Sequence, residues 1–216
     1  MTHTLHREGS EESLQNDFLL LVTRARNLND IGCGEKFKKL IDIIFSVGPT
    51  NYGSYELGKN IHTGLNVEEL KNATTDTARI RCVFSDRKKF KEVLSKIIKA
   101  NLGLSVTITG TISSIKKILD ELGITPHSIN LAMGTYGKTE KLPDKNFRKL
   151  TTMCGHGLIS PTLVRDMLYK IKKGQISIEK ASIEIGKPCV CGIYNQERAV
   201  TLLKELLPLY SIEELS

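Results

Sequence analysis

The sequence has no tryptophan, and only 6% of its residues are aromatic. Proteins that bind single-stranded nucleic acid interleave aromatic with basic side chains, and no segment shows that pattern, so the sequence argues against nucleic acid as a partner. Long apolar runs are also missing. The longest purely aliphatic or aromatic run covers residues 18–22, whereas a membrane span needs about 20 residues. We therefore expect no membrane partner.

The first residues lack the basic segment and the apolar stretch of a secretory signal. We therefore expect a soluble protein of the cytoplasm, where cysteines seldom form structural disulfides. The five cysteines are then expected to bind a metal, take part in catalysis or pack in the core. The sequence also lacks a P-loop, a dinucleotide fingerprint and a serine-centred elbow, so no common nucleotide-binding or serine-hydrolase class is indicated.

The chain does have enough apolar residues for a core, since 40% of its 216 residues are hydrophobic and 25% are charged. Its net charge is 31 − 24 = +7. This charge would suit an anionic metabolite, an acidic partner protein or nucleic acid. Many of the lysines, however, lie on helix faces opposite apolar stripes, where they would simply be solvated.

Alternating strands and helices predict the α/β class, as a sandwich of crossover units. Strands are expected at residues 18–22, which form a continuous apolar run, and at residues 78–84, 104–109 and 127–133, where apolar residues recur at every second position. Residues 50–65 show no period and are expected to form a long loop that borders a site. The predicted divisions are a polar arm over residues 1–16, an α/β domain over 17–143 and a helical unit over 144–216.

Three cysteines lie in the helical unit, each in a loop that leads into a helix. Cys154 precedes the expected N-cap Ser160, and Cys189 and Cys191 precede the expected N-cap Asn195. Helix N-termini present free N–H groups and a partial positive charge, which stabilise thiolates and anionic clusters. Packing of the helices is expected to bring the three thiolates together.

Our leading hypothesis is an iron-sulfur cluster of the 4Fe-4S type with three protein ligands, Cys154, Cys189 and Cys191. The spacing supports a cluster over zinc, because one residue separates the paired ligands where zinc sites usually leave two to four. Gly155, Gly157 and Gly192 would let the backbone approach the bridging sulfides.

Such a protein would be an anaerobic enzyme. An open iron would act as a Lewis acid on a small anionic substrate, with His156 as acid or base. The reaction class would be a lyase or sulfur-handling chemistry. Lys187 or Arg198 would balance the charge of the cluster.

Two alternatives remain open. In the first, His156 completes a zinc site with the three cysteines, and the protein is a non-enzymatic zinc-stabilised module that binds an acidic partner or nucleic acid. In the second, His156 activates Cys154 in a metal-free thiol enzyme. A zinc deaminase is excluded, because the spacing of Cys189 and Cys191 is one residue short and no His-x-Glu stands upstream.

Three further features have weaker assignments. Cys82 is expected to pack in the core, and Cys33 is either a fourth ligand, an exposed thiol or a residue without a role. The segment of His6, Arg7 and Glu8 is either a tail without a role, which the sequence favours, or an arm that closes over the site. The sequence leaves the oligomeric state open.

Residues 101–106 (NLGLSV), 152–157 (TMCGHG) and 187–193 (KPCVCGI), together with Asn195 and Arg198, resemble an uncharacterised protein family of anaerobic prokaryotes. The resemblance runs from His6 to the final helix. It implies an anaerobic setting, which favours an oxygen-sensitive cluster, and it implies no activity.

Overall fold

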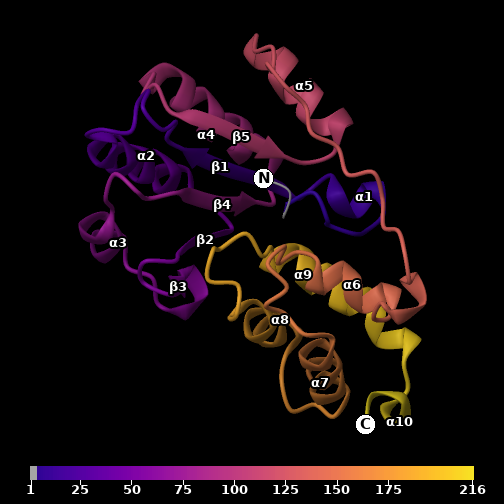
Figure 1. Ribbon diagram of the computed structural model, residues 1–216. Coiled ribbons are helices and arrows are strands. Elements are labelled where there is room, and N and C mark those ends of the chain that lie inside the picture. The colour runs from indigo at the N-terminus through magenta and orange to yellow at the C-terminus, as the bar shows by residue number, and fades with distance from the viewer. Residues whose placement is uncertain (1–3) are drawn as a thin grey trace.

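The structure is a computed structural model that describes residues 4–216. Its centre is a five-stranded sheet in the order β3-β2-β4-β1-β5 (Figure 1). The predicted mixed α/β class is confirmed. The strands are β1 (Phe18–Thr23), β2 (Asn51–Ser54), β3 (Lys59–Asn60), β4 (Ile80–Phe84) and β5 (Ser105–Thr109).

All four strand pairings are antiparallel. β4 and β5 flank β1 on opposite sides, so that Leu20 lies opposite Cys82 on one side and Ile108 on the other. Since both strands are antiparallel to β1, they run parallel to each other. The helix α4 (Arg87–Ala100) connects them past β1.

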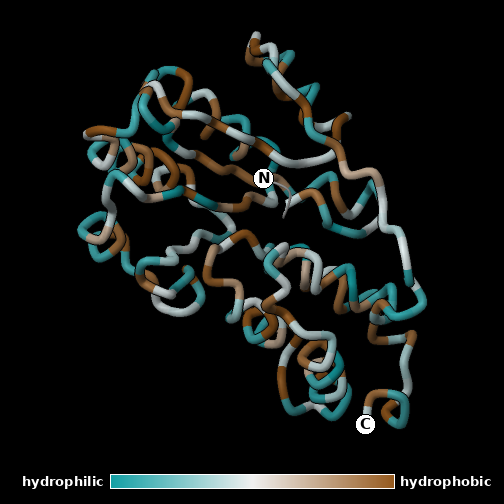
Figure 2. Tube along the Cα trace, viewed as in Figure 1, coloured by the Kyte–Doolittle hydropathy of each residue, from teal (hydrophilic) through white to brown (hydrophobic). Residues whose placement is uncertain are grey.

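The central strand β1 is apolar along almost its whole length (Figure 2). Successive side chains of a strand point to opposite faces of the sheet. Phe18, Leu20 and Val22 therefore join one core with α2 (Cys33–Val47) and α4, whereas Leu19 joins a second core with the C-terminal helices. One strand thus serves both cores, and the sheet is covered on both faces at this point.

The helices α2 and α4 form as the sequence predicts. Each buries an apolar stripe at helical spacing. Asp86 caps α4, since its side chain accepts a hydrogen bond of 2.9 Å from the backbone N–H of Lys89. Between β3 and β4 lie a short 3-10 turn, η1 (Ile61–Thr63), and the helix α3 (Val67–Ala73).

Residues 50–65 are not the long loop that the sequence predicts, because β2 and β3 lie within them. All four residues of β2 are buried although only Tyr52 has a large side chain. The Asn51 side chain donates a hydrogen bond of 3.1 Å to the carbonyl of Tyr194. Pairing with β4 and polar bonds to the helical unit thus override a weak local strand preference.

The strand predicted over residues 127–133 is also wrong. The helix α5 (Ile112–Leu122) ends at Gly123, and the chain then runs down the side of the molecule to α6 without joining the sheet (Figure 1). A strand needs a partner for its backbone groups. Among the described residues, no strand of the sheet pairs with this segment.

The C-terminal part is helical, and no strand lies beyond residue 146 in the described chain. Ser160, Ser177 and Asn195 cap its helices as predicted. No helix within residues 4–216 is long and apolar enough to cross a membrane. The elements are η2 (Thr139–Lys141), α6 (Lys145–Thr151), α7 (Pro161–Lys172), α8 (Ile178–Gly186), α9 (Gln196–Leu206), η3 (Leu207–Leu209) and α10 (Ile212–Leu215).

The N-terminal arm is bound where the sheet meets the helices, so the favoured expectation of a tail without a role is wrong. Asp17 has no exposed side-chain surface, and its carboxylate accepts hydrogen bonds from Arg7 at 2.7 Å and from Arg198 at 3.2 Å. Arg198 also donates to the carbonyl of Glu8 at 2.6 Å. The arm continues into the short helix α1 (Glu11–Leu14).

We expect Asp17→Asn to lower the free energy of unfolding by about 3–5 kcal/mol, because removing one partner leaves two buried guanidinium groups without a counter-charge. Urea unfolding followed by circular dichroism measures this loss. The control is Glu121→Gln, which removes a surface carboxylate paired with Arg87 and Lys91 and should change little. Equal effects of the two substitutions would contradict the role assigned to Asp17.

Candidate functional site

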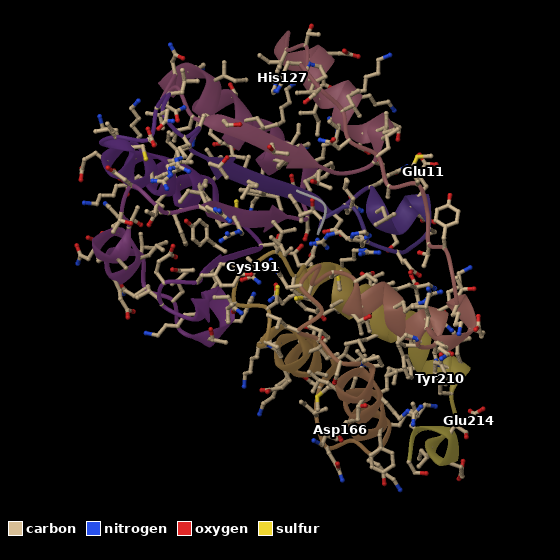
Figure 3. The ribbon with its side chains drawn as sticks, in the orientation of Figure 1. Glu11, His127, Asp166, Cys191, Tyr210 and Glu214 are labelled. Carbon is tan, nitrogen blue, oxygen red and sulfur yellow. The ribbon has the colours of Figure 1, made fainter. Side chains whose placement is uncertain are left out.

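The three cysteines of the helical unit lie in the two turns that precede α7 and α9. Cys154 follows α6, and Cys189 and Cys191 lie between α8 and α9. Their side chains are at most 2% exposed. Figure 3 shows Cys191 where the sheet meets the helical unit. The three sulfurs therefore lie inside the protein, whereas His156, two positions after Cys154, is exposed.

Close contacts connect the three thiols and His156. The Sγ atoms of Cys189 and Cys191 lie 3.6 Å apart, and the Cys189 thiol also shares a hydrogen bond with Cys154. His156 Nδ1 lies 3.7 Å from Cys191 Sγ. The structure thus brings together the three predicted ligand cysteines and the predicted acid or base. We call these four residues the thiol group.

Hydrogen bonding divides the thiol group into two thiolates and one thiol. The bond from the Cys189 thiol lowers the pKa of Cys154 and of Cys191 to about 6, against the opposing effect of burial. The same bonds raise the pKa of Cys189 well above its usual range. These bonds therefore favour negative charge on Cys154 and Cys191 and keep the proton on Cys189.

Backbone N–H groups of the two turns support both thiolates. Those of His156 and Leu158 lower the pKa of Cys154, and that of Ile193 lowers the pKa of Cys191. The turns are closed by Gly157, which donates to the carbonyl of Cys154, and by Gly192, which donates to that of Cys189, both at 3.0 Å. Both glycines have a positive φ of 69°, which explains the residue type there.

Strand β2 holds the second turn in place through direct contact between two backbones. A Cβ atom on Gly53 would overlap the carbonyl of Val190, and one on Gly192 would overlap the backbone N of Gly53. The Asn60 side chain, at the end of β3, donates to the carbonyl of Cys189 at 3.2 Å. The position of Cys189 and Cys191 therefore depends on Gly53 and Gly192, because a side chain on either glycine would separate the two backbones.

Tyr55 covers the thiol group from the turn after β2. Its hydroxyl lies 3.0 Å from each ring nitrogen of His156. The guanidinium of Arg81 lies 4.6 Å from the centre of the Tyr55 ring. Burial is the main cause that raises the pKa of Tyr55 to about 12, and the negative charge of Cys191 adds to it. Tyr55 therefore stays protonated and can donate to His156.

The remaining sequence candidates lie elsewhere. Cys33 and Cys82 belong to the core between the sheet and α2, not to the core that contains the thiol group. Cys33 lies 3.1 Å from the carbonyl of Asp30. Lys187 pairs with Glu184 at the surface and Arg198 pairs with Asp17, so neither makes the charge-balancing contact that the sequence suggested.

Sequence reasoning missed Gly53, Tyr55, Asn60 and Arg81. They are more than 70 positions from the cysteines in the chain, and each is of a type that is common in loops and strands. The one available signal was the density of glycine and tyrosine in residues 50–65. That density correctly suggested a segment that borders a site, although not its fold.

The four side chains of the thiol group contact one another in pairs but do not converge on a single point. Across residues 4–216, no three His, Cys, Asp or Glu side chains are already placed closely enough to hold a metal ion together. Comparisons of the chain with protein-family models, with curated proteins and with solved structures found no significant match. Its function must therefore be argued from the site itself.

We expect Gly192→Ala to destabilise the protein more than Gly174→Ala, whose φ is similarly positive at 68°. Both variants should lose about 1–2 kcal/mol from the left-handed backbone conformation. Only Gly192→Ala forces its Cβ into β2, which should cost about 1–3 kcal/mol more. Urea unfolding of both variants measures the difference, and equal losses would show that the two backbones are not in close contact.

The pH dependence of stability tests the two thiolates. A thiol whose pKa falls from 9.0 in the unfolded chain to about 6 in the fold stabilises the fold fully above pH 9. This contribution is lost as the pH falls towards 6. In the reduced, metal-free protein, we expect the free energy of unfolding to rise from pH 6 to pH 9 more steeply than in Cys154→Ala. Cys82→Ala is the control, because burial keeps the Cys82 thiol protonated. Equal slopes in wild type and Cys154→Ala would contradict the charge assignment.

Proposed function

We propose that Cys154, Cys189, Cys191 and His156 hold one tetrahedral metal ion, zinc, and that the protein is a zinc-stabilised binding module. This is one of the alternatives that the sequence leaves open. The observation that supports it most is the separation of the donor atoms. Cys191 Sγ lies 3.6 Å from Cys189 Sγ and 3.7 Å from His156 Nδ1.

These two separations fit the edges of a zinc tetrahedron. Zn–S bonds of about 2.3 Å and Zn–N bonds of about 2.0–2.1 Å give S–S edges of about 3.8 Å and S–N edges of about 3.6 Å. Cys154 is connected to this set through its hydrogen bond with Cys189. Because no three of the side chains yet surround one point, the proposal requires them to close around the ion.

The charges of the site also support a cation. The pKa of Cys154 and that of Cys191 are lowered although both residues are buried, and the charge of Cys154 opposes ionisation of Cys191. Buried like charges repel strongly unless a cation compensates them. A histidine that ligates a metal usually bonds a further group through its other ring nitrogen. With Nδ1 on the metal, the Nε2–H of His156 would donate to the Tyr55 hydroxyl oxygen, which lies 3.0 Å from both ring nitrogens.

A site with four protein ligands is of the structural type, because no position is left for a substrate. The ion would fix the two cysteine turns to each other and so hold the N-termini of α7 and α9 against β2. On this proposal the function of the protein is binding, and the net charge of +7 supports an acidic partner protein or nucleic acid.

The iron-sulfur enzyme remains the second candidate. It is supported by the backbone N–H bonds to the sulfurs of Cys154 and Cys191, which are usual at cluster sites, and by the resemblance to proteins of anaerobes. The short contact between the Sγ atoms of Cys189 and Cys191 counts against it. Thiolates that bind different irons of one cluster stand further apart than thiolates on one ion. Here His156 would be the acid or base toward a small anionic substrate.

We expect anaerobically purified protein to contain one zinc per chain and no acid-labile sulfide. Cys154→Ser, Cys189→Ser and Cys191→Ser should each lose the zinc, whereas Cys33→Ala and Cys82→Ala should retain it. Elemental analysis, a sulfide assay and an absorbance spectrum on the same samples make the measurement. Because a variant that fails to fold also loses metal, circular dichroism accompanies each one, and titration of metal-free wild type with Co²⁺ shows thiolate ligation directly.

Three other results would contradict the zinc proposal. Iron and sulfide in equal amounts, with broad absorption in the visible range, would establish the cluster. Protein that stays metal-free after reconstitution with zinc or with iron and sulfide would leave the thiol enzyme, in which His156 activates Cys154. Full metal content in all three serine variants would overturn the ligand assignment.

A further inference from the structure

A groove of about 920 Å³ opens along β5, the edge strand of the sheet. It is lined by β5, by one face of α5, by the end of α4 and by residues 124–132, and also by residues of the N-terminal segment, among them Arg7 and Asp17. In Figure 3, His127 lies beside α5, far from Cys191. The groove is therefore a feature separate from the proposed metal site, and the inference below does not rest on that proposal.

The groove contains an unpaired strand edge. Within residues 4–216, β5 is the last strand of the sheet and pairs with β1 alone. All of its residues are exposed or half-exposed, and Val106 is 38% exposed. A free edge presents a row of backbone donors and acceptors that another strand can pair with.

Residues 127–133 have the pattern of a strand but no partner. Their apolar side chains recur at every second position, and Ile129, Leu131 and Met133 are 67%, 58% and 79% exposed. Exposed apolar residues gathered beside a groove mark an interaction surface. The same face of the protein thus carries an edge strand with a free side and a strand-like segment that pairs with no strand of the described chain.

Two segments of this face lack charge, and the four charged residues that also line the groove, Arg7, Asp17, Lys116 and Asp120, balance in sign. Residues 102–115 and 124–137 contain no Lys, Arg, Asp or Glu, although 25% of the chain is charged. Two copies of a chain with a net charge of +7 repel each other over most of their surfaces. At this face that repulsion is smallest, and apolar burial can exceed it.

We propose that two copies of this chain associate through this face, with residues 127–133 of each copy added as a strand to the free edge of β5 in the other. The contact is reciprocal, so it closes as a two-fold dimer and leaves neither edge free. Strand addition supplies backbone hydrogen bonds, and Ile129 and Leu131 would fill the partner's groove. A second copy fits this groove better than a small ligand does. The free edge of β5 presents a row of backbone donors and acceptors, and a strand can pair with the whole row, whereas a small ligand makes only a few polar contacts.

The test is the solution mass of the full chain by light scattering, from micromolar to submillimolar concentration. We expect wild type at twice 24.1 kDa. The double variant Ile129→Glu, Leu131→Glu should dissociate, with a dimer dissociation constant raised by more than about tenfold. The control is Leu28→Glu, Ile31→Glu, which changes two residues that are 82% and 94% exposed in another loop and should leave the dimer intact.

Hydrogen exchange at β5 completes the test. We expect its amides to be protected in wild type and to exchange faster in the Ile129→Glu, Leu131→Glu variant, whose circular dichroism stays unchanged. A wild type that is monomeric at all concentrations would overturn the proposal. If β5 is nevertheless protected in that monomer, the segment pairs within its own chain and the second copy is excluded. A dimer that the double variant does not weaken would also overturn it.

Discussion

The contact between Gly53 and Gly192 is the constraint on which the arrangement of the site depends. A side chain on either residue would overlap the backbone of the other strand or turn. This contact lets β2, a strand of the α/β part, touch the turn that carries Cys189 and Cys191. Asn51 and Asn60 then bond carbonyl groups on either side of that turn. The position of two sulfurs in the helical unit is thus set by the sheet.

The junction is polar on one side and apolar on the other. On its polar side, Asp17 holds Arg7 and Arg198, which come from the two ends of the chain. On its apolar side, Leu19 and Val83 pack with the helices. The three cysteines of the thiol group lie in this second core, whereas His156 is exposed. The low dielectric of the core makes negative charge on the cysteines costly. A bound cation would remove that cost, which is the physical basis of the zinc proposal.

Local signals in the sequence predict the helices well. Ser160 followed by Pro161, and Asn195 before an apolar stripe, predict helix starts from chemistry within one turn, and both are confirmed. Their predicted starts also place the three cysteines in turns before helices. The alternating pattern of residues 78–84 predicts β4 in the same local way. It does not predict that both faces of the strand are covered, although all five residues of β4 are buried and Val83 belongs to the second core.

The features that depend on distant residues could not be predicted in this way. Nothing within β2 itself indicates a strand, because pairing with β4 and contact with Gly192 decide its conformation. Tyr55 and His156 are 101 positions apart, and no local pattern relates them. Residues 127–133 show the opposite case, in which a strand pattern is present and no strand of the described chain pairs with it.

The central claim is that three sulfurs and one nitrogen surround a single ion. X-ray absorption at the zinc edge, on protein loaded with one equivalent of zinc, tests it most directly. The account predicts three sulfur neighbours at about 2.3 Å and one nitrogen neighbour at about 2.0–2.1 Å. A spectrum that shows only oxygen and nitrogen neighbours, with no sulfur at bonding distance, would contradict it.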